Sequence, residues 1–239
     1  MIKKILSTLL VSSALFVFAA TSSFADRPTL NVGFTAAYGG YEASGQENEG
    51  AGVVEIHKKS EAGEFGYSSF FIEVSIKDRL TLGASWMADE VETAMTSRTD
   101  TIPDGTSVAE GAGNATVGTS NAGTSTVKAA FSNLVTGYVE LNIWNGLYAK
   151  YGVMEMDVET KESLHTDSAY PNATMDGDTY GFGWKGSFDN GVFIKTETLM
   201  QNWSDLKLEA EGSTGTDNNN SVEASLSGAV ATISIGKAF

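Results

Sequence analysis

Three residues near position 165 have the side chains of a hydrolytic site. Ser163, His165 and Asp167 could supply a nucleophile, a base and a carboxylate that orients the base. Side chains this close in one loop or strand rarely converge on one point, and no second catalytic motif accompanies them. His57 and His165 are the only histidines in the chain. We therefore predict that the protein is not an enzyme and has no catalytic residues.

Oxygen-rich segments are the second group with possible chemistry. Asp176 and Asp178 flank a glycine, and Asp217 precedes three asparagines. Carboxylates and loop carbonyls suit Ca²⁺ or Mg²⁺, but neither segment has the twelve-residue spacing of a calcium loop. These aspartates are weak candidates for loosely bound divalent cations, and no other cofactor is expected. The chain has no cysteine, which excludes disulfides and thiolate metal sites.

The elements that must position these residues are β-strands. Beyond Asp26 apolar residues recur at every second position, as in the run that begins Leu30, Val32 and Phe34. A period of two, broken by Gly, Asn and Asp, is typical of strands. We predict eight strands, within residues 30–38, 69–76, 80–88, 127–143, 147–153, 180–185, 192–200 and 229–239.

The connections between these strands alternate in length. Short ones at 77–79, 144–146 and 187–191 alternate with long ones at about 39–65, 90–122, 163–177 and 204–220. Short turns at one end and long loops at the other are the layout of an up-and-down antiparallel β-barrel in an outer membrane. The even number of strands places both termini at the short-turn end. We predict four long extracellular loops and short periplasmic turns.

The two faces of the strands differ in polarity. If the apolar face meets lipid, seven charged residues point inward: Glu73, Lys128, Glu140, Lys150, Lys185, Lys195 and Glu197. An eight-stranded barrel is only wide enough to be filled by side chains, so these residues are predicted to form a plug of mutual salt bridges. The alternative is a narrow ion path along the same charges. Aromatic residues lie near the ends of the apolar face, as interfacial girdles require: Tyr38, Trp86, Tyr151, Tyr180, Trp184 and Phe239.

Charge is concentrated in the predicted loops. The 239 residues include 30 acidic and 15 basic side chains, a formal net charge of -15. The segments 39–65, 89–122, 155–178 and 203–220 together carry -18, so the predicted wall and turns are nearly neutral. The excess of acidic over basic side chains argues against nucleic-acid binding, which needs clustered Lys and Arg.

The N-terminus has the pattern of a secretory signal peptide. Lys3 and Lys4 precede an apolar stretch, residues 5–20, and Ser23-Phe24-Ala25 supplies small residues at the cleavage positions. We predict cleavage after Ala25, with residues 26–239 as the barrel domain. An exported chain without cysteine points to a bacterial envelope.

Together these features resemble a known family. The signal peptide, the eight alternating strands, the alternation of turns and loops, and the ending Ala231-x-Ile233-x-Ile235-x-Lys237-x-Phe239 are similar to small eight-stranded bacterial outer-membrane barrels of the outer membrane protein A and X type. The resemblance implies the outer membrane of a Gram-negative bacterium, contact with its lipid and lipopolysaccharide, and a monomer. It also implies that Phe239 is part of the signal read by the barrel-assembly machinery.

The favoured interpretation is an integral outer-membrane barrel with a structural or surface-interaction role carried by acidic loops. A narrow, weakly cation-preferring passive channel is the first alternative. A secreted acidic β-sandwich that acts as a binding module is the second, because alternation alone does not tell a lipid-facing apolar surface from a buried one.

Overall fold

A computed structural model describes residues 28–51, 53–77, 79–102, 121–163, 170–209 and 221–239. The predicted signal peptide, and His165, Asp167 and Asp217, lie outside these ranges. The described part contains no helix long and apolar enough to cross a membrane. Its strands are β1 (Thr29–Ala51), β2 (Val53–Ile76), β3 (Leu80–Met87), β4 (Val91–Glu92), β5 (Thr96–Ile102), β6 (Asn121–Trp144), β7 (Leu147–Ser163), β8 (Ala173–Ser187), β9 (Val192–Trp203), β10 (Leu206–Glu209) and β11 (Ser221–Ala238).

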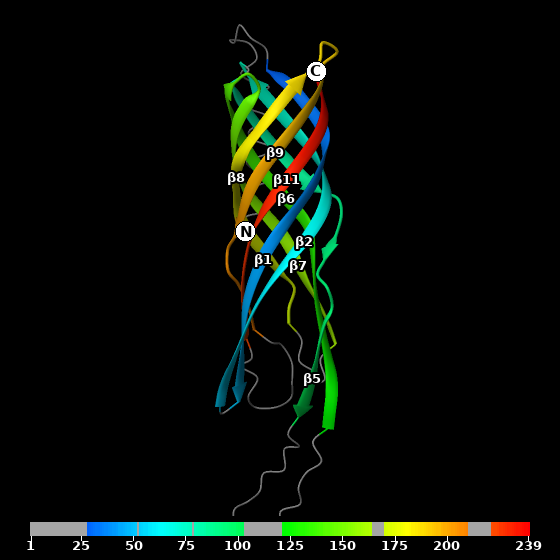
Figure 1. The fold of residues 1–239 in the computed structure, drawn as a ribbon, viewed down its shortest axis with the longest axis vertical. Helices are drawn as coiled ribbons and strands as arrows, with labels where there is room; N and C mark the ends of the chain where they lie inside the picture. Colours follow the sequence, from blue (N-terminus) through cyan, green and yellow to red (C-terminus); the bar gives the residue numbers. More distant parts are fainter. Residues whose placement is uncertain (1–27, 52, 78, 103–120, 164–169, 210–220) are drawn as a thin grey trace, which may run out of the picture.

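Eight of these strands close into a ring. Neighbours pair antiparallel in the order β1-β2-β3-β6-β7-β8-β9-β11, and β11 pairs back with β1. At the seam the Phe239 amide donates a hydrogen bond to the Leu30 carbonyl over 2.8 Å. Strands β4 and β5 pair with β6 beyond the end of β3, and β10 pairs with β11 beyond the end of β9. The predicted eight-stranded up-and-down barrel is confirmed (Figure 1).

The three tight turns lie where the alternation predicted them. Trp144 ends β6 and Leu147 begins β7, with φ of 46° at Asn145 and 83° at Gly146. Positive φ at both central residues is the hairpin turn that Asn-Gly favours, because it matches the twist of the strands. The described chain starts and ends at the same end of the barrel as these turns, shown at the top of Figure 1.

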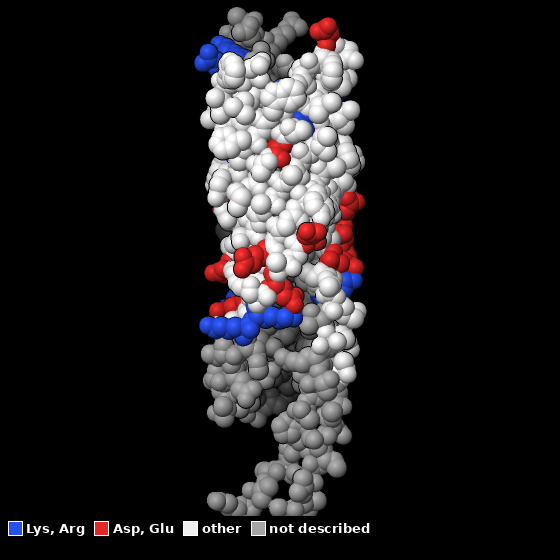
Figure 2. All heavy atoms as spheres, in the orientation of Figure 1, with Lys and Arg blue, Asp and Glu red and all other residues white. Residues whose placement is uncertain are grey.

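The apolar face of the barrel wall points outward. Tyr38 and Ile233 expose 60% and 58% of their surface, and all six aromatic residues predicted at the ends of this face are exposed. In a sandwich of two sheets the same residues would form the core, so that alternative is wrong. Figure 2 shows a belt with few charged residues, and acidic side chains gathered below it, toward the ends of the longest strands.

Polarity inverts at one level of the wall. On β7 the outward residues change from Val153 to Asp157 across the buried Glu155, while the inward residues change from Lys150 to the buried Met154. On the turn side of this level the barrel is apolar outside and polar inside, as lipid requires. On the far side it is charged outside and apolar inside, as in a protein surrounded by water.

A β-bulge in β6 corrects one sequence prediction. Residues 127–143 were predicted to keep one face outward, but the β6–β7 register shifts between Ser132 and Val135, and Asn133 has φ of 54°. One extra residue exchanges the two faces of the strand. Phe131, predicted to face lipid, therefore packs against the buried core. Lys128, predicted to point inward, lies on the outer side.

The first long connection is also more ordered than predicted. Residues 39–65 were expected to form a loop, yet β1 and β2 stay paired residue by residue as far as Ala51 and Val53. Figure 1 shows this hairpin reaching toward the end of the barrel opposite the tight turns. The barrel wall is therefore continued by a protruding ladder rather than by an irregular segment.

Glycines on the inner face make room for aromatic rings. Gly83 is paired directly with Tyr138 of the neighbouring strand, and a Cβ atom at Gly83 would overlap the Tyr138 ring. The same cross-strand arrangement recurs around the barrel, in the pairs Gly33–Phe71, Gly183–Tyr148 and Gly236–Phe193. An aromatic side chain lying across a neighbouring glycine fills the interior without crowding the backbone.

We predict that Gly83→Ala lowers the free energy of unfolding by about 1–3 kcal/mol, because the added methyl group displaces the Tyr138 ring from a filled interior. The measurement is urea unfolding of the refolded protein in detergent, followed by tryptophan fluorescence. Gly137→Ala is the control, since a Cβ atom there meets nothing within 4 Å. Equal stability of the two variants would contradict the role assigned to Gly83.

Candidate functional site

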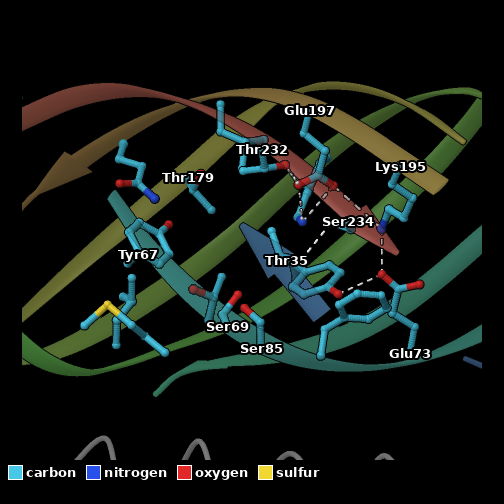
Figure 3. Close-up of a pocket in the computed structure, with 18 residues that line it drawn as sticks. Thr35, Tyr67, Ser69, Glu73, Ser85, Thr179, Lys195, Glu197, Thr232 and Ser234 are labelled. Carbon is cyan, nitrogen blue, oxygen red and sulfur yellow. Dashed lines mark hydrogen bonds and ion pairs between the residues drawn. The ribbon is translucent and has the colours of Figure 1, made fainter. Parts of the chain in front are cut away.

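Five charged side chains meet inside the barrel. Lys195 of β9 lies 2.6 Å from Glu73 Oε1, contacts Glu140 Oε1, and is 3.6 Å from Glu197 Oε1. Lys150 of β7 lies 2.9 Å from Glu197 Oε1 and 3.7 Å from Glu140 Oε1. Each of these side chains is at most 9% exposed. We call these five residues the interior network. Figure 3 shows three of them, Glu73, Lys195 and Glu197.

Neutral donors complete the contacts of two carboxylates. The Tyr138 hydroxyl donates to Glu73 over 2.8 Å, and the Tyr148 hydroxyl donates to Glu197 over 2.7 Å. Thr232 also donates to Glu197, over 3.2 Å. Buried charges are tolerated when ion pairs and hydrogen bonds satisfy them together. The network draws on strands all around the ring, so it links parts of the wall that are not adjacent.

The lysines also lie against aromatic faces. The Lys150 ammonium is 3.9 Å from the centre of the Tyr138 ring, and Lys195 is 5.1 Å from that of Tyr148. Sequence reasoning missed both tyrosines as members of the site. The alternation of faces could have identified them. Tyr138 precedes Glu140 by two residues and Tyr148 precedes Lys150 by two, so each tyrosine shares the inner face with its charged neighbour.

Two of the seven predicted interior charges, Lys128 and Lys185, are not among these five. Beyond the bulge Lys128 contacts Glu92 at the outer surface, and Lys161 joins them at 2.9 Å from Glu92. Hydrogen bonds from these lysines lower the pKa of the exposed Glu92 carboxyl to about 2. Lys185 is on the inner face but near the turns, with its ammonium 4.2 Å from the centre of the Phe193 ring.

Two cavities lie on opposite sides of the network. At the turn end a vestibule of about 590 Å³ reaches Glu140 and Tyr148 and is bordered by Lys185 and Trp184. On the loop side a smaller cavity of about 40 Å³ borders Glu73, Glu197 and both network lysines. Its wall is rich in hydroxyl groups, from Thr35, Ser69, Ser85, Thr136, Thr179, Thr232 and Ser234 (Figure 3).

An apolar cluster closes the interior beyond the smaller cavity. It consists of Met87, Leu134, Met154, Met156, Val158, Met175 and Trp203, each at most 7% exposed. Met87 and Leu134 also line the small cavity, so the cluster is its wall on the loop side. Sequence reasoning did not predict this cluster, because it assumed that the inward face stays polar along each strand.

The weak metal and catalytic candidates do not form a site among the described residues. Asp176 and Asp178 point outward from β8, in strand rather than loop, and Glu155 lies opposite Asp176. No three His, Cys, Asp or Glu side chains in the described ranges are grouped so as to hold a metal ion. Ser163 ends β7 and is exposed, while its suggested partners His165 and Asp167 lie outside those ranges.

Comparisons with known proteins support the architecture. No family model and no curated protein sequence matches the chain. Among solved structures, outer membrane protein OprG from Pseudomonas aeruginosa is similar with a TM-score of 0.51 and 8% identity, over 88% of this chain and 95% of OprG. Outer membrane protease OmpT from Escherichia coli has a TM-score of 0.40 and 9% identity, over 88% and 97%. The attachment invasion locus protein Ail of Yersinia pestis has 0.35 and 11%, over 84% and 97%.

At 8% identity the similarity to OprG shows a common fold and nothing about activity, and the two looser similarities carry no argument. The fold agrees with the pairing of the strands, the outward apolar face and the filled interior described above. The chain therefore has the fold of the small bacterial outer-membrane β-barrels.

Proposed function

We propose that the chain is an integral, monomeric outer-membrane β-barrel of a Gram-negative bacterium, without catalytic activity and with a structural or surface-interaction role. The observation that carries the proposal is the inverted wall, in which a closed ring of strands exposes Phe70, Phe182 and Ile233 and buries Glu73 and Lys195. Such a surface is stable when lipid covers it, since water would leave a large apolar belt exposed.

The loop end of the barrel is the part that would meet other molecules. Beyond the apolar belt the outward side chains are mainly acidic (Figure 2). They include Asp157, Asp176 and Asp178 on neighbouring strands. Lipid and lipopolysaccharide are the partners proposed for the wall and its rim. At the opposite end Phe239 is 72% exposed, which leaves its ring available to the barrel-assembly machinery during insertion.

The interior network suits a structural plug. Its ion pairs and hydrogen bonds occupy the cross-section of a barrel that is narrow for any solute. A second candidate function, a narrow passive channel with a weak preference for cations, is favoured by the vestibule of about 590 Å³ that leads from the turn end to Glu140.

We predict that Ile233→Arg lowers the free energy of unfolding in lipid by about 2–4 kcal/mol, as for arginine facing lipid near the membrane centre. The same change at an exposed position of a water-soluble protein would alter it by about 0.5 kcal/mol or less. The measurement is denaturant unfolding of protein reconstituted in lipid vesicles. Ala62→Arg, exposed on the protruding hairpin, is the control and should be nearly neutral. A neutral Ile233→Arg would argue against lipid contact.

We predict that Lys195→Met lowers the free energy of unfolding by about 3–5 kcal/mol, because it leaves Glu73 and Glu140 buried without their main partner. Lys161→Met, which removes an exposed lysine with two carboxylate partners, should cost about 1 kcal/mol or less. Urea unfolding in detergent compares the two. Similar losses for both variants would show that the network contributes no more to the free energy of unfolding than a surface ion pair does.

We predict that the purified barrel gives no conductance steps in planar lipid bilayers, because side chains fill its cross-section. Steps that disappear in the double variant Glu140→Gln/Lys150→Met would instead support the channel. Insertion is verified in each sample by the slower gel mobility of heated protein, since a closed barrel resists unfolding in detergent without heating.

A further inference from the structure

The interior network is bordered by water-accessible space on the turn side. The vestibule opens at the turn end and extends to Glu140 and Tyr148, which belong to or contact the network. Ions and water entering from this end can therefore approach the buried charges. The network is the inner limit of an open polar space rather than part of a uniformly packed core.

The small cavity on the other side of the network is also suited to water. Thr179 is 1% exposed, its Oγ1 has no hydrogen-bond partner, and its side chain lines this cavity. A polar cavity of about 40 Å³ exceeds the roughly 10–15 Å³ that one water needs, and buried polar atoms are normally satisfied. Water in this space would complete the contacts of Thr179. The network then separates two hydrated spaces and is not a dry barrier.

The polar interior stops at the apolar cluster. Met87 and Leu134 form its first layer, and Met154, Met156 and Val158 follow one another along the inner face of β7. From Met154 to Val158 is four residues, or roughly 13 Å of strand at about 3.3 Å per residue. With a strand tilt of about 40°, this is an apolar layer roughly 10 Å deep. Its one buried N–H, Trp203 Nε1, has no hydrogen-bond partner among the described residues.

We propose that this apolar cluster, and not the interior network, is the barrier that prevents ions from crossing the barrel. Hydrophobic constrictions exclude ions because water does not fill them, so an ion would have to lose its hydration without receiving substitute ligands. The network offers an ion charged and hydroxyl ligands. The cluster side chains carry no oxygen atom, and their one N–H, on Trp203, donates only and does not coordinate a cation. The inference rests on the proposed function, since a barrier to ions has meaning only in a barrel that spans a membrane.

Planar-bilayer conductance of two matched variants tests this assignment. Met154→Gln/Met156→Gln keeps the side-chain length but brings polar groups into the cluster, and it should gain conductance steps that the wild type lacks. Glu140→Gln/Lys150→Met removes one charge of each sign from the network and should remain silent. Met200→Gln, which faces outward with 43% exposure, is the control for the chemistry of the substitution and should also be silent.

Two results would overturn the inference. One is a silent Met154→Gln/Met156→Gln barrel together with a conducting Glu140→Gln/Lys150→Met barrel, which would assign the barrier to the network. The other is steady conductance by wild-type protein that is folded and inserted in the membrane. Met156→Gln alone serves if the double variant does not fold. Gel mobility before and after heating, and recovery in the lipid fraction, separate these results from failure of the proposed function, because a chain that does not insert gives neither signal.

Discussion

Lys195 and the carboxylates around it set the cross-section of the barrel. Its ammonium contacts Glu73 from β2 and Glu140 from β6, strands that are separated around the ring from its own strand, β9. Removing these charges from water costs several kcal/mol per ion, which their contacts must offset. The ion pairs therefore need short distances and satisfied hydrogen bonds, and other residues of the inner face make this geometry possible. Glycines give space to rings, and the hydroxyls of Tyr138 and Tyr148 hold carboxylates in place.

The interior is layered along the barrel axis as a consequence. Vestibule, charges, hydroxyl groups and methionines follow one another from the turns toward the loops. The order matches the outside of the wall, because the apolar cluster begins at Met154, where the outward residues of β7 change from Val153 to Asp157. On the turn side, where the wall meets lipid, the outer face is apolar. On the loop side, where the wall meets water, the inner face is apolar instead.

Much of this fold could be predicted from alternation and turn residues. The eight strands, the three tight turns and the inward position of Glu73, Glu140 and Lys195 follow from a period of two, since parity decides which face a residue occupies. The contacts of Lys195 do not follow, because parity says nothing about the distance across a closed ring. Lys128 was misplaced because the extra residue at Asn133 has no clear signal in the pattern. The paired hairpin at 39–65 was missed because its glycines and charges are typical of loops.

Because of the bulge at Asn133, one continuous strand, β6, fits lipid along one part of its length and water along the other. On its turn side β6 obeys the rules of a lipid-embedded wall, and on its other side those of a water-soluble sheet. A single inserted residue makes the change without altering the number of strands or their order around the ring. A barrel with this device can lengthen beyond its membrane simply by adding residues to existing hairpins, so its height is free to vary while its diameter stays constant.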